Sequence, residues 1–234
     1  IKIFHRSKSE AIAVARRLVS EVNRLEQKFS RYRNNSFLSE INCKAFDGGI
    51  DLDKETSAII DYVAECYVLS DGLFDVTTGA LRSIWNHSLG TVPSDNLMEP
   101  CLSRIGWTNV HWQRPRIRYL KEGLEIDLGG VVKEFAVDRC ISLCLEAGIK
   151  SVLVNLGGDL RVSGPAPGGQ PWSIRIRDPR DPKSFLRSIY LSSGALATSG
   201  DYERCIEVQG KKYGHIFNPL TGWPVEYMAS VSVL

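Results

Sequence analysis

Apolar residues with helical spacing fill the first half of this chain, whereas strand-like alternation fills most of the second half. The helical period is clear over 11–29 and again over 59–67, where Asp53 is placed to cap the helix. Segments such as WSIRIR at 172–177 alternate apolar and polar residues, as half-buried strands do. Because helices and strands are segregated along the chain, we predict an α+β fold with a mixed, largely antiparallel sheet packed with helices.

The second half gives more specific expectations. Strands are predicted at 107–119 and 124–127, followed by a helix from about Val131 that Gly148 ends. SVLVNLGGDLRVSG reads as strand, turn and strand, and IEVQGKKYGHIFNP reads as a hairpin. The segment SIYLSSGALATSG is expected to begin as a strand and to end as a loop of small residues.

The domain organisation is predicted to be a single domain over 1–234. Its length also allows two lobes, a helix-rich one at about 1–106 and a strand-rich one at 107–234. Both ends of the sequence fall inside strand patterns, so we interpret the chain as truncated at both ends. For this reason, the absence of a signal peptide from this sequence is no evidence about the location of the protein.

Composition excludes several classes of protein. Apolar residues make up 43% and charged residues 24%, with a net charge of +2, so neither a nucleic-acid surface nor a membrane surface is indicated. The basic run RPRIRYLK is interpreted as one solvated face of a strand. Six cysteines without regular spacing predict neither a zinc site nor a disulfide framework, and no apolar run is as long as a membrane span.

Four loops carry residues suited to ligand binding: FDVTTG, DLGGVVK, ALATSGDYE and GHIFNPLTG. Each has a structural alternative, since Asp75 is equally a helix cap and Thr198 equally satisfies turn amides. Together they predict a pocket for a large anion, in which glycines and a helix start suit a pyrophosphate and Lys133 suits its charge. Tyr32 and Phe74 suit a flat ring, and the common nucleotide-binding and hydrolase motifs are absent.

These segments, together with FSRYRNNSFLSEIN and VNLGGDLRVSG, resemble the ApbE family of FAD:protein FMN transferases and occur in that family's order. The resemblance implies binding of FAD and Mg²⁺, transfer of FMN to a threonine hydroxyl of an acceptor protein, and release of AMP. The implied acceptors are subunits of membrane redox complexes such as sodium-pumping quinone reductases. The resemblance also implies a bacterial periplasmic location, as an inner-membrane lipoprotein.

The resemblance assigns roles to individual positions. Gly130 is expected to hold the metal through its backbone carbonyl, and His215 is the expected catalytic residue. The expected FAD contacts are Tyr32, Leu73, Phe74, Asp75, Asp127, Lys133, Thr198, Ser199 and Phe217.

The sequence departs from the family pattern at several places. Glu134 follows Lys133 where glycine is common, and Asn218 stands where aspartate is usual. The family's downstream aspartate and threonine, which ligate Mg²⁺, would lie beyond Leu234, and its Met-Gly-Thr segment would precede Ile1. Two alternatives therefore stay open: an FAD-binding or carrier module without transfer, and a Mg²⁺-dependent FAD pyrophosphatase.

Overall fold

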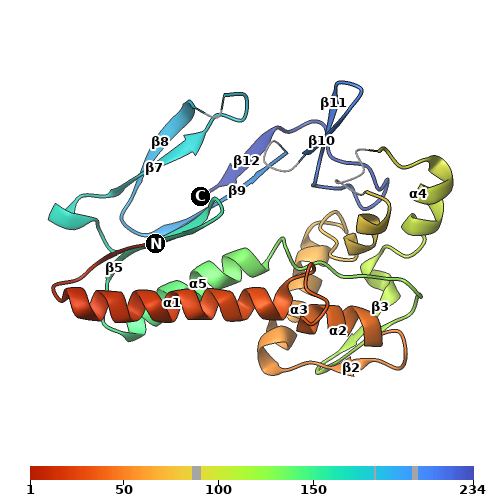
Figure 1. Cartoon of the computed structure of the whole chain (residues 1–234), viewed down its shortest axis with the longest axis horizontal. Coiled ribbons are helices and arrows are strands. Elements are labelled where there is room, and N and C mark those ends of the chain that lie inside the picture. Colours follow the sequence, from red (N-terminus) through yellow and green to blue (C-terminus); the bar gives the residue numbers. More distant parts are fainter. Residues whose placement is uncertain (86–90, 182, 202–204) are drawn as a thin grey trace. The chain divides into compact units, whose positions relative to one another are not determined.

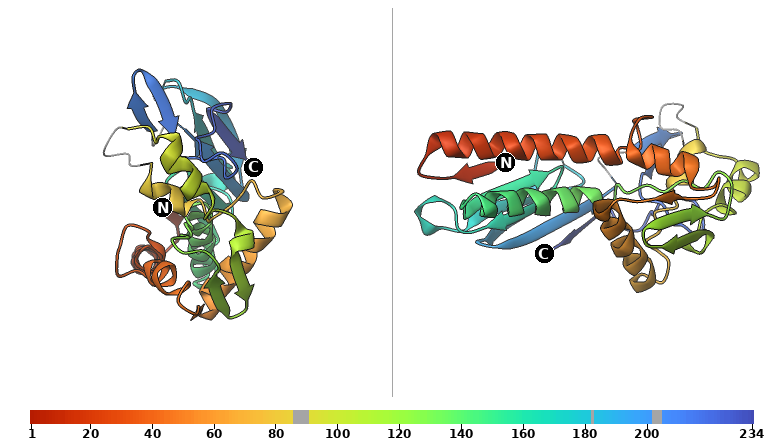
Figure 2. Two further views of the ribbon diagram at one scale, coloured as in Figure 1. Left: turned by 90° about the vertical axis from the view of Figure 1, so that its right-hand side faces the viewer. Right: turned by 90° about the horizontal axis from the view of Figure 1, so that it is seen from below.

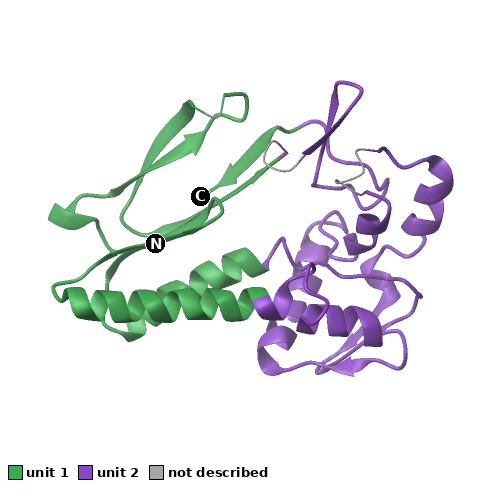
Figure 3. Cartoon of the chain, in the orientation of Figure 1, with its two compact units in different colours: residues 1–26, 132–200, 228–234 green, residues 27–131, 201–227 purple. Residues whose placement is uncertain are grey.

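The computed structural model describes residues 1–85, 91–181, 183–201 and 205–234. The chain divides into two compact units, coloured separately in Figure 3. Unit 1 contains 1–26, 132–200 and 228–234, and unit 2 contains 27–131 and 201–227. The units therefore interleave along the sequence and do not divide near residue 106, where the sequence suggested two lobes. Among the described residues, no helix combines the length and apolar character needed to span a membrane.

Unit 1 is built on a five-stranded sheet in the order β1-β5-β6-β9-β12, and each neighbouring pair is antiparallel. The sheet strands are β1 (Lys2–Phe4), β5 (Ser151–Leu156), β6 (Asp159–Ser163), β9 (Gly194–Gly200) and β12 (Ser230–Val233). Helix α1 (Lys8–Phe29), of which the residues up to Glu26 belong to this unit, runs beside α5 (Val132–Glu146) in Figures 1 and 2. The predicted α+β fold with antiparallel pairing is confirmed.

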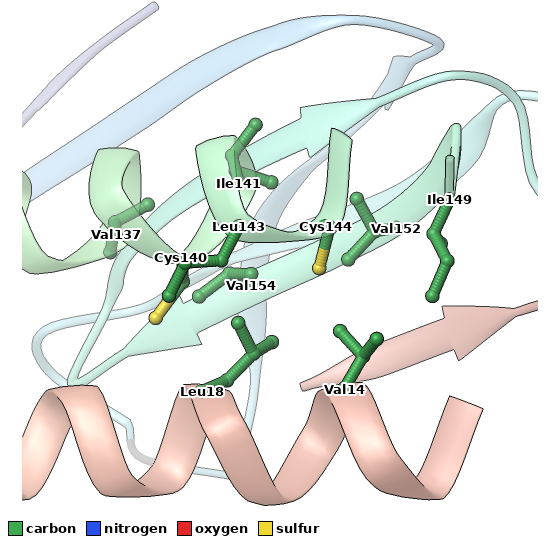
Figure 4. Packing of buried hydrophobic residues seen from close by; sticks show 10 residues of the cluster. All are labelled: Val14, Leu18, Val137, Cys140, Ile141, Leu143, Cys144, Ile149, Val152 and Val154. Atoms are coloured by element: carbon green, nitrogen blue, oxygen red, sulfur yellow. The ribbon is translucent and has the colours of Figure 1, made fainter. Parts of the chain in front are cut away.

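The core of unit 1 lies between these two helices and the sheet (Figure 4). Val14 and Leu18 of α1 face Val137 and Cys140 of α5, while strand β5 contributes Val152 and other residues. Burial raises the pKa of the Cys140 thiol to about 11, which keeps it neutral. Cys140 therefore acts as a small apolar side chain, as predicted.

A β-hairpin of β7 (Trp172–Arg177) and β8 (Phe185–Leu191) completes unit 1. One face of it packs through Trp172 and Ile174 onto Leu160, Val162 and Leu196. The short 3₁₀ helix η3 (Pro167–Gly169) precedes this hairpin.

Unit 2 contains the remaining elements. These are α2 (Phe37–Lys44), β2 (Ile50–Asp51), α3 (Lys54–Leu69), η1 (Gly79–Ser83), α4 (Asp95–Leu102), η2 (Trp107–Asn109), β3 (Val110–Gln113), β4 (Arg116–Tyr119), β10 (Cys205–Val208) and β11 (Lys211–Gly214). Strands β2, β4 and β3 form one small sheet, and β10 and β11 form the predicted hairpin. Asp53 caps α3, as predicted, by accepting from the Thr56 amide at 2.9 Å, and Ser36 caps α2.

Two local predictions are wrong. Residues 124–127 do not form a strand, because the Asn42 side chain takes the place of a neighbouring strand: its amide nitrogen donates to the Ile126 carbonyl at 3.0 Å, and its oxygen accepts from the Ile126 amide at 2.9 Å. A single parallel bridge joins Glu125 to Thr78. The small residues at 194–200 form strand β9 rather than a loop, since β6 and β12 pair with its two halves. Residues 79–83 form the 3₁₀ helix η1.

Candidate functional site

The FDVTTG loop follows α3 in unit 2, and Asp75 organises it. One carboxylate oxygen of Asp75 accepts from the Thr77 amide at 2.8 Å and from the Thr77 hydroxyl at 2.6 Å. The other oxygen accepts from the Trp107 amide at 3.0 Å, and the Thr77 hydroxyl in turn accepts from the Gly106 amide at 2.7 Å. Asp75 is buried, so its carboxylate fixes the loop on which Leu73 and Phe74 stand.

Phe74 lies against the glycine turn of the DLGGVVK motif. A Cβ added at Gly130 would be 3.3 Å from the Phe74 ring, tighter than nearly all real contacts of that kind. Because Gly130 has no side chain, the half-buried Phe74 ring can lie close to the backbone of Gly130, including its carbonyl. The neighbouring Leu73 is exposed. The sequence placed these two loops in one site, and unit 2 brings them into contact.

Asp127 is held from two directions. The Arg31 guanidinium forms an ion pair with one carboxylate oxygen of Asp127, and the Gly129 amide donates to the other at 2.9 Å. Arg31 also donates to the Tyr32 hydroxyl at 2.8 Å and stacks over its ring at 4.9 Å. Burial opposes the charge of Arg31, but Asp127 and Tyr32 outweigh it, so the pKa of Arg31 is raised. Arg31 thus connects two residues that the sequence assigned to FAD contact.

Unit 1 holds a second cluster, centred on Asp159. The ammonium group of Lys133, in the first turn of α5, forms an ion pair with one carboxylate oxygen of Asp159. The other oxygen accepts from the Thr198 amide of β9 at 3.0 Å, and the Thr198 hydroxyl is 2.9 Å from that of Ser232. The Asp159 side chain is 4% exposed and that of Lys133 is 47% exposed, so a buried acid anchors an accessible cation.

Glu134 lies beside this cluster. Its Oε2 atom is buried and has no hydrogen-bond partner among the described residues. Burial raises the pKa of the Glu134 carboxyl most, and the nearby Asp159 carboxylate adds to this, although a hydrogen bond from the residue's own backbone and the charge of Lys133 oppose it. Glu134, which stands where the family commonly has glycine, therefore lies in surroundings that favour its neutral form.

His215 and Phe217 follow β11 in unit 2. His215 is half-buried, and the Phe217 ring lies 5.6 Å from that of Trp85, within a cluster that includes Trp223. Asn218 folds the next turn, because its side chain accepts from the Leu220 amide at 2.9 Å and its carbonyl accepts from the Gly222 amide at 2.8 Å. An amide therefore makes the turn at the position where the family usually has an acid.

The predicted residues are distributed over both units. Unit 2 contains Tyr32, Leu73, Phe74, Asp75, Asp127, Gly130, His215 and Phe217, whereas unit 1 contains Lys133, Thr198 and Ser199. Within unit 2, Gly130 meets Phe74, and Arg31 joins Asp127 to Tyr32. Within unit 1, Lys133 and Thr198 meet at Asp159, and Ser199 is paired with Val231 of β12. The last three residues of ALATSGDYER lie outside the described residues.

Two residues of these clusters were missed from the sequence, Arg31 and Asp159. Both occur in segments that were recognised, FSRY and GGD, but neither residue type in its local pattern indicates which side chain it will meet. Their partners are 96 and 26 residues away.

A magnesium site is not formed by the described residues alone. None of them make up a group of three or more histidine, cysteine, aspartate and glutamate side chains able to hold a metal ion. Gly130 offers one peptide carbonyl, whereas Mg²⁺ takes octahedral oxygen coordination. The residues described therefore do not fit a complete Mg²⁺ site.

Comparison with known proteins relates the chain to one family. The model of the ApbE family matches residues 1–234. A protein of Chlamydia pneumoniae named FAD:protein FMN transferase is 33% identical, over 93% of this chain and 71% of its own length. A Vibrio cholerae protein of the same name is 30% identical, over 93% of this chain and 66% of its own length.

Solved structures agree with the sequence match. The ApbE protein of Thermotoga maritima has a TM-score of 0.88 at 36% identity, covering 94% of this chain and 73% of its own. The flavin transferase ApbE of Vibrio cholerae has a TM-score of 0.82 at 26% identity, covering 98% of this chain and 74% of its own. The chain thus matches a large part, but not the whole, of each protein. By sequence and by fold, the chain belongs to the ApbE family and, with it, to a class of transferases.

Proposed function

We propose that the protein transfers the FMN portion of FAD to a threonine hydroxyl of an acceptor protein. The threonine oxygen forms a bond to the phosphorus on the FMN side of the pyrophosphate, and the bond from that phosphorus to the bridging oxygen breaks. AMP leaves with the electron pair, and the threonine proton passes to a base. The names of the matched relatives support the coarser part of this reaction, transfer of FMN from FAD to a protein.

The observation that carries the proposal is the meeting of two motifs at Asp159. Lys133 comes from DLGGVVK and Thr198 from ALATSGDYE, and one buried carboxylate contacts both. An exposed ammonium group held in a defined place suits a phosphate oxygen. In this proposal Lys133 binds the pyrophosphate, and the Thr198–Ser199 segment lines the same place.

FAD contacts are also proposed for residues of unit 2, as the family resemblance implies. Tyr32 and Phe74 offer ring faces for the flavin or adenine, with Leu73 and Phe217 contributing apolar contact. Asp75 acts in this proposal by holding the Phe74 loop, since both of its oxygens already accept hydrogen bonds. Asp127, fixed by Arg31, is a candidate acceptor for hydroxyl or amino groups of FAD.

His215 is the proposed base for the threonine proton, because an imidazole is the common general base near neutral pH. Mg²⁺ is proposed as an activator that would neutralise phosphate charge, with the Gly130 carbonyl as one ligand. Because the described residues do not complete a metal site, no step of the reaction is assigned to the cation.

The acceptor is proposed to be a subunit of a membrane redox complex, and the location to be the bacterial periplasm, with an inner-membrane lipid anchor. Both follow from the family resemblance. A flavin transferase requires an acceptor protein, and the described helices offer no membrane span of their own.

Mass spectrometry of an acceptor protein tests the proposal. The chain is incubated with FAD, MgCl₂ and an acceptor whose target is threonine, alongside the acceptor with that threonine changed to valine. We expect the first acceptor alone to gain the mass of FMN less one water, with AMP released in equal amount. AMP and free FMN without acceptor modification would instead identify a pyrophosphatase. Tight binding of intact FAD without AMP would identify a carrier.

A further inference from the structure

The β3–β4 ribbon of unit 2 has two faces of opposite character. Its strands are antiparallel, with His111 opposite Arg118 and Gln113 opposite Arg116. One face packs into the core through Val110, Ile117 and Tyr119. The other face presents four exposed hydrogen-bonding side chains, those of His111, Gln113, Arg116 and Arg118. Arg116 and Arg118 belong to the basic run RPRIRYLK, which the sequence suggested to be an ordinary solvated face of a strand.

A cavity of about 280 Å³ lies over this face, lined by the four side chains and by Gly48. Gly48 and Gly49 form its border, with positive φ angles of 106° and 88°. A Cβ at Gly49 would come within 2.8 Å of the Ile117 carbonyl, so only glycine lets this loop lie against β4. The hollow thus results from a glycine loop fitted closely to the strand.

Arg116 is fixed in the wall of the cavity. Its guanidinium donates to the Asp51 carboxylate at 2.8 Å, and to the carbonyls of Gly48 at 2.8 Å and Gly49 at 3.3 Å. These bonds hold the planar group in one orientation and neutralise its charge with one acid.

Arg118 is different. Within the described part of the chain, no hydrogen bond or ion pair engages its guanidinium, and Asp51 is already paired with Arg116. His111 stands directly opposite it across the ribbon. The cavity therefore carries one uncompensated positive charge, beside amide and imidazole groups that can donate to the same ligand.

We propose that this cavity binds a small molecule bearing a phosphate monoester. A free guanidinium makes paired hydrogen bonds to two oxygens of a phosphate, and the Gln113 amide is placed to donate to a third. The volume is at the lower limit of ligand pockets, roughly 300–1,000 Å³, which suits a small phosphorylated ligand better than a dinucleotide. The site is separate from the residues assigned to FAD and goes beyond the proposed transfer reaction.

Titration of the full chain with inorganic phosphate and with phenyl phosphate, followed by calorimetry without FAD, tests the proposal. We expect saturable binding that Arg118→Gln weakens at least tenfold. Lys121→Gln, which removes one positive charge from an exposed position outside the lining, should change the affinity less than twofold. Equal losses in the two variants, or no saturation by either phosphate, would overturn the site.

Three further measurements sharpen the test. Gln113→Glu keeps the side-chain shape but adds a negative charge to the lining, so it should abolish phosphate binding while thermal unfolding stays unchanged. Unaltered binding by this variant contradicts the proposal.

Acetate serves as the competing oxyanion. If acetate binds as tightly as phosphate does, the cavity is a site for carboxylates instead. A phosphoserine peptide that binds at least tenfold more tightly than phenyl phosphate would keep the phosphate chemistry but place it on a protein segment.

Discussion

Lys133 and Asp159 form an ion pair in which the acid is almost fully buried and the cation is half exposed. The acid lies at the first residue of β6 and the cation in the first turn of α5. Because the Thr198 amide also donates to Asp159, this pair joins a helix and two strands of unit 1.

Because only the acid of this pair is buried, replacing Lys133 and replacing Asp159 should lower the free energy of unfolding by different amounts. Lys133→Ala leaves a buried carboxylate with a single amide donor, so we expect a loss of about 1–3 kcal/mol in the free energy of unfolding. Asp159→Asn should cost less, since the Lys133 ammonium group can turn into water and asparagine still accepts from Thr198. Urea unfolding of both single variants and the double variant measures this. A larger loss for Asp159→Asn would contradict the described geometry.

Lys133→Ala is also expected to weaken FAD binding by about 1.5–3 kcal/mol, since a charge-assisted hydrogen bond to phosphate is lost. Flavin fluorescence titration measures the affinity, at a temperature where the variant is folded. Lys150→Ala removes an exposed lysine from the same unit and should leave the affinity unchanged. Equal FAD affinity in the Lys133 variant would remove the link between this residue and the cofactor.

The raised pKa of Glu134 leads us to expect that the stability of the protein changes with pH. Its pKa is raised in the folded protein, so the folded state binds this proton more tightly than the unfolded state does. The associated stability is present below the ordinary value of 4.5 and is lost as pH rises through the folded pKa. Glu134→Gln should therefore unfold at higher urea than the parent near pH 7, and this advantage should shrink towards pH 4. A constant difference across that range would show that the charge is not responsible.

The lowered pKa of Asp53 leads us to expect the opposite dependence of stability on pH. Burial opposes its charge, but hydrogen bonds from Lys28 and Thr56 outweigh this and lower its pKa below 3.8. The capping contribution is thus complete above that value and is lost as pH falls through the folded pKa. Asp53→Ala should cost about 1 kcal/mol at pH 7, and less at pH 3. Asp47→Ala, an exposed acid outside the helices, is the matched control, and thermal unfolding at both pH values gives the comparison.

His215→Ala is predicted to reduce FMN transfer by about 10²–10⁴-fold, the usual contribution of a general base, with a smaller effect on FAD affinity. Single-turnover labelling of the acceptor and flavin fluorescence separate the two effects. An equal loss in both would assign His215 to binding rather than to proton transfer.

Local sequence patterns predicted the helices well because the determinants are local. The apolar period of α1 and the caps Ser36 and Asp53 act within a few residues of each other. Strand β9 was missed because its small residues carry no periodic signal, and their pairing depends on β6 and β12. Residues 124–127 were misassigned because Asn42, a distant side chain, satisfies their backbone.

The candidate site shows the same division. Motif order predicted that the four loops share a pocket, and two of them, the Phe74 loop and the turn at Gly130, lie against each other in unit 2. Arg31 and Asp159 were missed because their roles depend on partners brought near only by folding. Likewise, the unpartnered Oε2 of Glu134 is a consequence of packing that no local pattern reports.

The interleaving of the two units affects how the protein is made. Strand β12 belongs to the sheet of unit 1 but is translated after the β10–β11 hairpin of unit 2, so the ribosome must synthesise all of unit 2 before that sheet gains its edge strand. Cutting the chain at any single bond will not release either unit in one piece, because both contain separate stretches of sequence.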